Sequence, residues 1–102
     1  MTKVSIKHGG GRCLLSAKGH ATGSPEVCAA ISSIIYAFAG YMTNAMRDRY
    51  VEFYTWKMDS GDVLLDFNGD AGTDAAFEMV VIGLRQIEQS FPEFICVSLL
   101  EE

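Results

Sequence analysis

Short segments of alternating apolar and polar residues recur along the chain, and this period of two is typical of β-strands with one buried face. Turn residues at 9–11 separate the first two segments, and those at 59–62 separate the next two. The pattern predicts two β-hairpins followed by a final strand. The five expected strands cover residues 3–7, 12–18, 50–58, 63–67 and 94–100.

Two longer segments have apolar residues three or four positions apart, which predicts helices over residues 25–46 and 73–90. Ser24 is a good N-cap for the first helix, and Thr73 or Asp70 is expected to cap the second. The order of elements is therefore β-β-α-β-β-α-β. Consecutive hairpins favour a mainly antiparallel sheet with both helices on one face.

The size and composition of the chain suit one small globular domain. It has 102 residues, of which 49% are hydrophobic, so it buries one modest core. We therefore expect a single α+β domain over residues 1–102. The formal net charge of −5 comes from 8 basic and 13 acidic residues, without a basic cluster. This balance argues against direct nucleic-acid binding, because phosphate contacts need a basic surface.

One stretch of the first predicted helix resembles a membrane span in length. Residues 27–46 carry no charge, but serine, glycine, threonine and asparagine interrupt the apolar run. Since alternating strands and turns surround this stretch, we expect a central helix covered by the rest of the domain, and no membrane partner. Residues 1–5 lack the apolar core of a signal peptide, which favours a cytoplasmic location.

Three cysteines, Cys13, Cys28 and Cys96, cannot all form disulfides with one another. Free thiols fit a reducing compartment, again the cytoplasm. The chain has no C-x-x-C pair, and its acidic residues do not match the spacing of an EF-hand. We therefore expect no metal site and no cofactor.

Cys28 and His20 form a candidate nucleophile–base pair. Cys28 falls in the first turn of the predicted helix, where the helix dipole and free backbone N–H groups favour a thiolate. Glu26 in the same turn suits the positive end of that dipole. His20 lies in the preceding loop, where Gly19 and Gly23 let the chain bend and a substrate approach. Backbone N–H groups at the helix start, including that of Cys28, are candidate donors to an oxyanion.

Cys28 and the other cysteines, histidine and serine with possible chemical roles also have purely structural interpretations. Free cysteine is among the most buried residue types, so by residue type alone a cysteine near an apolar helix face is more often structural than catalytic. Ser32, one turn later, either hydrogen-bonds near the thiolate or donates back to the Cys28 carbonyl. Cys13 and Cys96 are expected in the core, and His8 as a solvated residue of the first hairpin.

The segments Gly19-His20-Ala21 and Val27-Cys28-Ala29-Ala30-Ile31-Ser32 together resemble the bacterial ribosomal-processing cysteine protease family, Prp. The resemblance extends over essentially the whole chain and implies a dimeric α+β protein. It also implies removal of an N-terminal extension from a large-subunit ribosomal protein, with cleavage after an aromatic residue. In this sequence His20 matches the catalytic histidine, Cys28 the nucleophile and Ser32 a serine that follows one turn later.

Two features depart from the ribosome-processing members. The loop between His20 and Cys28 is shorter, and Pro25 replaces an aspartate, which leaves Glu26 as the nearest acid. We therefore expect a cysteine endopeptidase that acts on a peptide extension of a ribosomal or phage structural protein. The main alternative is a catalytically weak or inactive paralogue that binds a peptide. A third is a thiol redox or acyl-transfer protein that uses Cys28 alone.

The aromatic segment at 50–58 also predicts a homodimer. Strict alternation makes both of its faces apolar, and a second subunit is expected to cover one of them. The two faces are Tyr50, Tyr54 and Trp56 on one side and Val51, Phe53 and Thr55 on the other.

Overall fold

The computed structural model describes residues 1–21, 23–48 and 51–100, and it confirms the predicted order β-β-α-β-β-α-β. Most element ends lie within a few residues of those expected, and Tyr50, predicted to begin the third strand, lies outside the described residues. The elements are β1 (Thr2–Gly9), β2 (Arg12–Lys18), α1 (Pro25–Asp48), β3 (Glu52–Asp59), β4 (Asp62–Asn68), α2 (Ala71–Ser90) and β5 (Ile95–Leu99).

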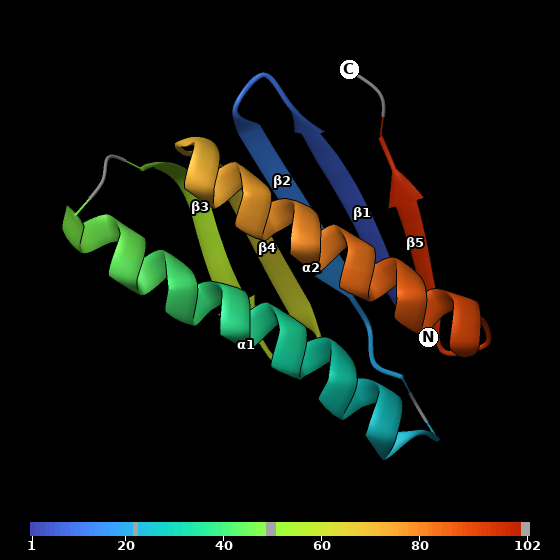
Figure 1. Cartoon of the computed structure of the whole chain (residues 1–102). Coiled ribbons are helices and arrows are strands. Elements are labelled where there is room, and N and C mark those ends of the chain that lie inside the picture. The colour runs from blue at the N-terminus through green and yellow to red at the C-terminus, as the bar shows by residue number, and fades with distance from the viewer. Residues whose placement is uncertain (22, 49–50, 101–102) are drawn as a thin grey trace.

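The strands form one five-stranded sheet in the order β3-β4-β2-β1-β5 (Figure 1). All neighbours pair antiparallel except β1 and β5, which are parallel, so the prediction of a mainly antiparallel sheet is confirmed. α1 leads from β2 to the parallel strand β3, and α2 leads from β4 to the parallel strand β5. The first connection crosses toward the β3 edge of the sheet and the second toward the β5 edge. Because the strands from which they start, β2 and β4, run in opposite directions, two right-handed connections place both helices on the same face.

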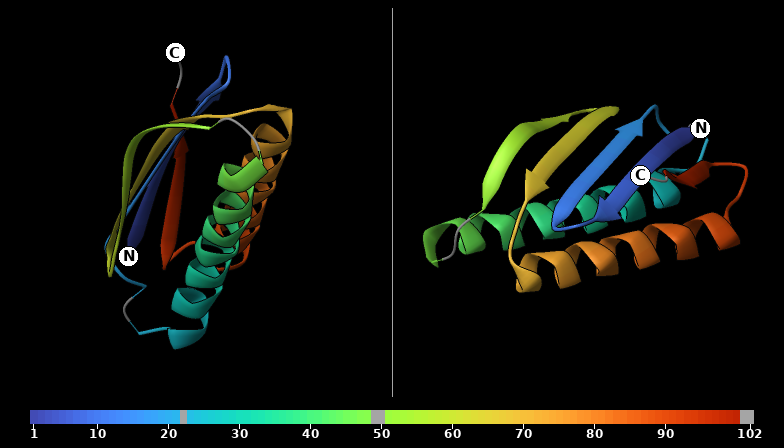
Figure 2. Two further views of the ribbon diagram at one scale, coloured as in Figure 1. Left: turned by 90° about the vertical axis from the view of Figure 1, so that its left-hand side faces the viewer. Right: turned by 90° about the horizontal axis from the view of Figure 1, so that it is seen from above.

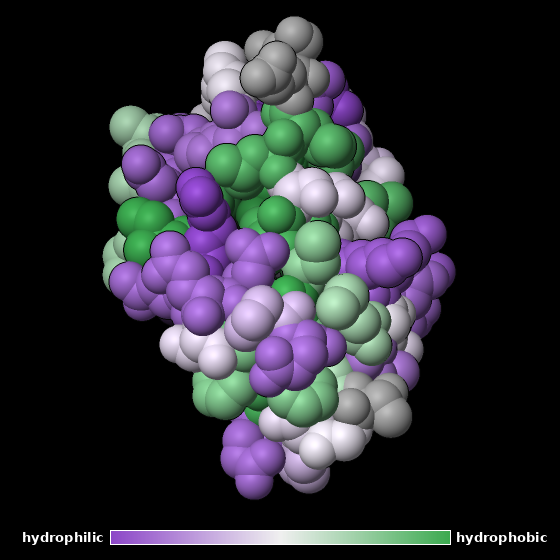
Figure 3. All heavy atoms as spheres, turned by 90° about the vertical axis from the view of Figure 1, so that its right-hand side faces the viewer, coloured by the Kyte–Doolittle hydropathy of each residue, from purple (hydrophilic) through white to green (hydrophobic). Residues whose placement is uncertain are grey.

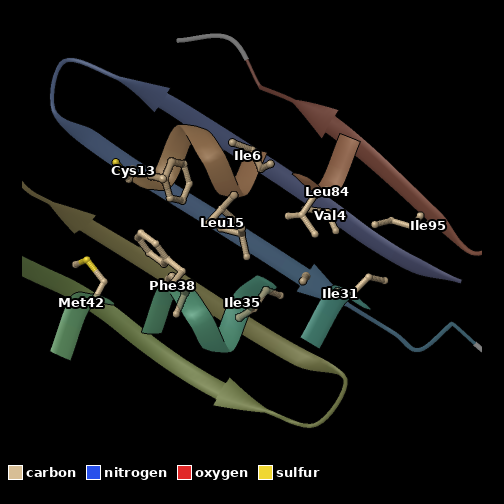
Figure 4. Packing of buried hydrophobic residues seen from close by; sticks show 14 of the residues in the cluster. Val4, Ile6, Cys13, Leu15, Ile31, Ile35, Phe38, Met42, Leu84 and Ile95 are labelled. Atoms are coloured by element: carbon tan, nitrogen blue, oxygen red, sulfur yellow. The ribbon is translucent and has the colours of Figure 1, made fainter. Parts of the chain in front are cut away.

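Figure 2 shows the resulting two layers, with the sheet on one side and both helices on the other. The core lies between the two layers. Phe67 of β4 and Phe77 of α2 are fully buried at its centre, where their ring centroids are 5.7 Å apart. Figure 4 shows side chains from α1, α2 and the strands meeting in this space.

α1 packs one face on the sheet and leaves the opposite face exposed. Tyr36 on that outer face is 64% exposed, so the expectation of a helix covered by the rest of the domain is only partly met. Pro25–Ala45 is long and apolar enough to span a membrane by length and composition, and 28% of an 18-residue stretch within it is buried. Its buried residues keep the spacing of an amphipathic helix: Val27, Ile31, Ile35, Phe38, Met42 and Ala45.

A side chain caps the N-terminus of each helix. The Val27 N–H donates to Ser24 Oγ at 3.4 Å, which agrees with Ser24 as the predicted N-cap of α1. At α2 the Thr73 N–H donates to Asp70 Oδ1 at 2.9 Å, so Asp70 and not Thr73 is the cap. These bonds satisfy N–H groups that have no partner within the helix itself.

A β-bulge in β3 makes the predicted alternation of its aromatic residues wrong. The register with β4 shifts between Phe53 and Thr55, which moves the following residues to the other face. Phe53 and Trp56 therefore share the helix side, where their rings meet edge to face with centroids 5.1 Å apart. Tyr54 lies on the solvent side, with the Arg12 guanidinium carbon 4.3 Å from its ring centroid.

β5 is an exposed edge strand, and Figure 3 shows apolar surface on this side of the molecule broken up by hydrophilic side chains. Leu99 and Leu100 there are 53% and 48% exposed. Cys96 is also exposed because Ile95, its neighbour in the strand, takes the buried position; the prediction that Cys96 is a core residue is wrong. Cys13 is buried, as predicted.

Candidate active site

A cleft of about 150 Å³ opens where the β2–α1 loop, the first turns of α1 and the β3–β4 turn meet. The loop leads directly into α1, whereas the β3–β4 turn is distant in sequence. The pairing of β2 with β4 brings this turn to the cleft, with Lys18 opposite Asp62 at this end of the sheet. Its lining includes both members of the predicted pair and several other polar side chains: His20, Cys28, Ser32, Tyr36, Asp59, Ser60 and Asp62.

Cys28 lies half-buried in the first turn of α1, with its side chain on the cleft. Its N–H donates to the Ser24 carbonyl at 3.1 Å, which is the first intrahelical bond. The expectation that the Cys28 N–H binds an oxyanion is therefore not met, because this N–H already has a partner. What the helix start offers the sulfur is the positive end of its dipole.

His20 is exposed at the mouth of the cleft, and its imidazole lies directly against the backbone of Gly61. A Cβ at Gly61 would lie 2.8 Å from His20 Cε1 and 3.0 Å from Cδ2, and closer still to Nε2. Gly61 also has φ +72°, a conformation that residues with a Cβ rarely adopt. The β3–β4 turn thus forms a surface against which the imidazole rests.

A backbone hydrogen bond holds the two loops of the cleft together. The Gly19 N–H donates to the Gly61 carbonyl at 2.9 Å, next to the His20 ring. Gly19 has φ +90°, and a Cβ there would collide with the Met1 carbonyl oxygen at 2.5 Å. Positive φ favours glycine at both ends of this contact, and at Gly19 the backbone clash excludes a larger residue. The contact positions the backbone from which the His20 side chain extends.

The other predicted site residues divide between the cleft and its surroundings. Gly19 and Ser32 line the cleft with Cys28 and His20, whereas Gly23 and Glu26 are not among its lining residues. Glu26 is exposed and accepts a 3.5 Å hydrogen bond from the Ser24 hydroxyl at the helix start. Its acidic side chain therefore supports the helix N-terminus and does not contribute to the cleft.

An ion pair stiffens the β3–β4 turn beside the cleft. Lys57 Nζ donates to Asp62 at 2.6 Å and lies 3.9 Å from Asp59. This hydrogen bond lowers the pKa of Asp62 and raises that of Lys57, so both stay charged near neutral pH. Because all three groups are substantially exposed, water screens the pair and its contribution to stability is small.

The β3–β4 turn is the part of the cleft that the sequence did not predict. Residues 59–62 were recognisable as a turn, but turn composition carries no information about which loop the turn will touch. Gly61 was one indirect indication of a tight turn there, because glycine is common at turn positions with positive φ.

An α+β domain whose cleft holds a helix-start cysteine and a loop histidine has the components of a thiol-dependent hydrolase. The family model described as "Cysteine protease Prp" matches residues 1–96. The chain therefore belongs to the Prp cysteine protease family, as the resemblance of its two motifs implied.

Solved structures share this fold over nearly their whole length. The ribosomal processing protease Prp from S. aureus, in complex with a covalently linked product peptide, has a TM-score of 0.73 and 16% identity, covering 98% of this chain and 100% of that one. The same protease with a substrate peptide has a TM-score of 0.71 and 14% identity, with the same coverage. SMU.848 from Streptococcus mutans has a TM-score of 0.72 and 21% identity, covering 100% and 96%. No curated protein matches the chain significantly.

Proposed function

We propose that this chain is a cysteine endopeptidase that uses Cys28 as nucleophile and His20 as proton carrier to remove a peptide extension from a ribosomal protein. A phage structural protein is the alternative substrate. The observation that carries the proposal is that both side chains line one cleft. The free thiols of Cys28 and Cys96 suit a cytoplasmic enzyme.

In the proposed reaction the Cys28 thiol gives its proton to His20, and the sulfur attacks the scissile carbonyl carbon to form a C–S bond. His20 then protonates the leaving amine as the C–N bond breaks. A water molecule, deprotonated by His20, hydrolyses the thioester, which releases the carboxylic acid product and restores the thiol.

The developing oxyanion needs a hydrogen-bond donor other than the Cys28 N–H, which the Ser24 carbonyl already binds. We assign this role to the Ser32 hydroxyl, which lines the same cleft one turn further along α1. A hydroxyl rotates freely, so it can donate to the oxyanion or to the thiolate as the reaction proceeds.

Peptide is the substrate class that the structural neighbours support best, because the S. aureus protease holds peptides in two of them. The test is to incubate the full chain with synthetic peptides and to analyse the products by mass spectrometry. One set spans N-terminal extensions of large-subunit ribosomal proteins, and the other spans phage structural proteins. We expect two fragments whose masses add up to the substrate plus one water. Absence of cleavage in both sets would contradict the proposal.

The contact of His20 with Gly61 makes Gly61 a positioning residue for this reaction. We expect Gly61→Ala to lower kcat/KM by about 10²-fold, because the new methyl group pushes the imidazole out of place. Peptide cleavage is measured beside thermal unfolding, so that loss of activity is separated from loss of folded protein.

Gly11→Ala is the matched control for this variant. Gly11 also has positive φ, +82°, but a Cβ there has no neighbour within 4 Å. Both variants should lose about 1 kcal/mol from backbone strain, and only Gly61→Ala should lose activity. Equal activity of the two variants would show that the position of His20 against Gly61 is unimportant.

We also propose that the chain forms a symmetric homodimer, with the second copy covering the apolar hollow between α1 and β3. This hollow has a volume of about 270 Å³ and is lined by Ala39, Met42, Thr43, Phe53 and Trp56. Trp56 is 36% exposed at its rim, so apolar ring surface remains in contact with water. Sedimentation velocity at micromolar concentration should give twice the chain mass of 11.2 kDa. A clean monomer would contradict the dimer.

A further inference from the structure

A second cluster of polar side chains lies away from the cleft, where β1, β2 and the start of α2 meet. His8, Cys13 and Asp74 each offer one potential ligand atom there, and these atoms all lie within 4.8 Å of one another. We propose that the three side chains bind a divalent transition-metal ion, for which zinc is the best chemical match. This site is independent of the proposed peptidase reaction.

Strand pairing and helix docking bring the three residues together. His8 and Cys13 stand directly opposite each other in the β1–β2 hairpin, so their side chains share the helix-facing side of the sheet. Asp74 comes from the first turn of α2, and its Oδ1 lies 2.5 Å from His8 Nε2. The prediction that His8 is solvated is wrong, because its side chain is only 22% exposed.

Imidazole, thiolate and carboxylate are the three ligand types that zinc uses in proteins, at distances of roughly 2.0 to 2.3 Å. Ligand atoms on one tetrahedral ion are then roughly 3.3 to 3.8 Å apart. Small side-chain rotations are therefore enough to place the three ligand atoms around one ion. A neutral imidazole with a thiolate and a carboxylate also balances the charge of a divalent ion.

The surroundings of the cluster fit a metal site with one open position. His8 and Asp74 face a hollow of about 380 Å³, whose other lining residues are Gly9, Gly10, Gly11, Gly69, Asp70 and Ala71. This hollow admits the ion and leaves room for water as a fourth ligand. On the other side, the His8 ring packs edge to face on Phe77 with centroids 5.0 Å apart, which holds the orientation of the imidazole.

Cys13 is unsuited to the chemistry proposed for Cys28. Burial, with a smaller effect of Asp74, raises the pKa of Cys13 to about 12, so the thiol stays protonated and unreactive. A coordinated divalent ion reverses this preference, because a thiol that binds a metal loses its proton. Figure 4 shows Cys13 at the opposite end of the core from Ile31, which lines the cleft. The ion would therefore link two strands to α2 without entering the active site.

The test is titration of the full chain with cobalt(II), which replaces zinc and reports thiolate ligation through a sulfur-to-metal charge-transfer band. We expect this band at one equivalent, both in the parent and in the double variant Cys28→Ala/Cys96→Ala, where Cys13 is the remaining cysteine. Excess zinc should abolish the band and raise Tm by at least about 5 °C at concentrations far above Kd.

Single substitutions then identify the ligands. Cys13→Ser should remove the charge-transfer band, and His8→Gln and Asp74→Asn should each weaken cobalt binding by more than about 10-fold. Asp74 is 43% exposed, so Asp74→Asn is a decisive variant even if Cys13→Ser fails to fold. Absence of the band in the double variant would overturn the proposal. Unchanged binding by both His8→Gln and Asp74→Asn would also overturn it.

Discussion

Replacement of Cys28 by alanine is expected to abolish peptide cleavage, with a fall in kcat on the order of 10⁶-fold, as loss of a covalent nucleophile produces. The thiol supplies the bond to the acyl group, and alanine has no atom that replaces it. Cys28 is half-buried and the change in side-chain volume is small, so the loss of stability should be about 1 kcal/mol. Fragment yield by mass spectrometry and a thermal melt measure the two effects separately.

Cys96→Ala is the matched control, because Cys96 is exposed on β5 and does not line the cleft. It should cleave as the parent does. Cleavage by Cys28→Ala at the rate of the parent would reject Cys28 as the nucleophile. Absence of cleavage in both proteins, with equal peptide affinity, would favour the alternative of a peptide-binding paralogue.

His20→Ala is expected to lower kcat/KM by more than about 10²-fold, the usual contribution of a positioned general acid–base group. It should leave the fold intact, because the His20 side chain is exposed and the hydrogen bond beneath it joins the backbones of Gly19 and Gly61. Cleavage kinetics give the loss of activity. The rate of Cys28 alkylation by iodoacetamide should fall in parallel, since the proposed proton acceptor of the cleft is gone.

Free imidazole provides a second readout for the same variant. If the missing group is a proton carrier, added imidazole should enter the open cleft and restore part of the lost activity. Nearly full activity of His20→Ala without imidazole would point to chemistry by Cys28 alone, such as redox or acyl transfer. A loss that imidazole does not restore, together with a lower Tm, would indicate a structural role.

Local sequence patterns predicted most of the fold. Alternation, helical spacing and turn residues were enough to predict the order of elements, because each depends on residues close together in the chain. The faces of β3 were not predictable in this way. A bulge between Phe53 and Thr55 reversed them, and its position depends on how β3 packs against its partner strand.

The candidate site was predictable to the extent that it is local. Cys28 and His20 are eight residues apart, so one short loop and a helix start bring both to the same region. Glu26 was a reasonable choice by sequence distance, but the turn of α1 directs it to Ser24 and solvent. Gly61 lies far along the chain, and no pattern around it indicates contact with His20.

Short-range periodicity thus specified the elements and their order, and side-chain chemistry together with the family resemblance pointed to Cys28 and His20 as the candidate pair of the cleft. The loop that supports His20 and the approach of Asp74 to His8, across 66 positions of the chain, become apparent only in the folded protein. Both depend on strand pairing and helix docking, which are set by the packing of the whole core. A contact between distant residues is a consequence of that packing and leaves no mark in the local sequence.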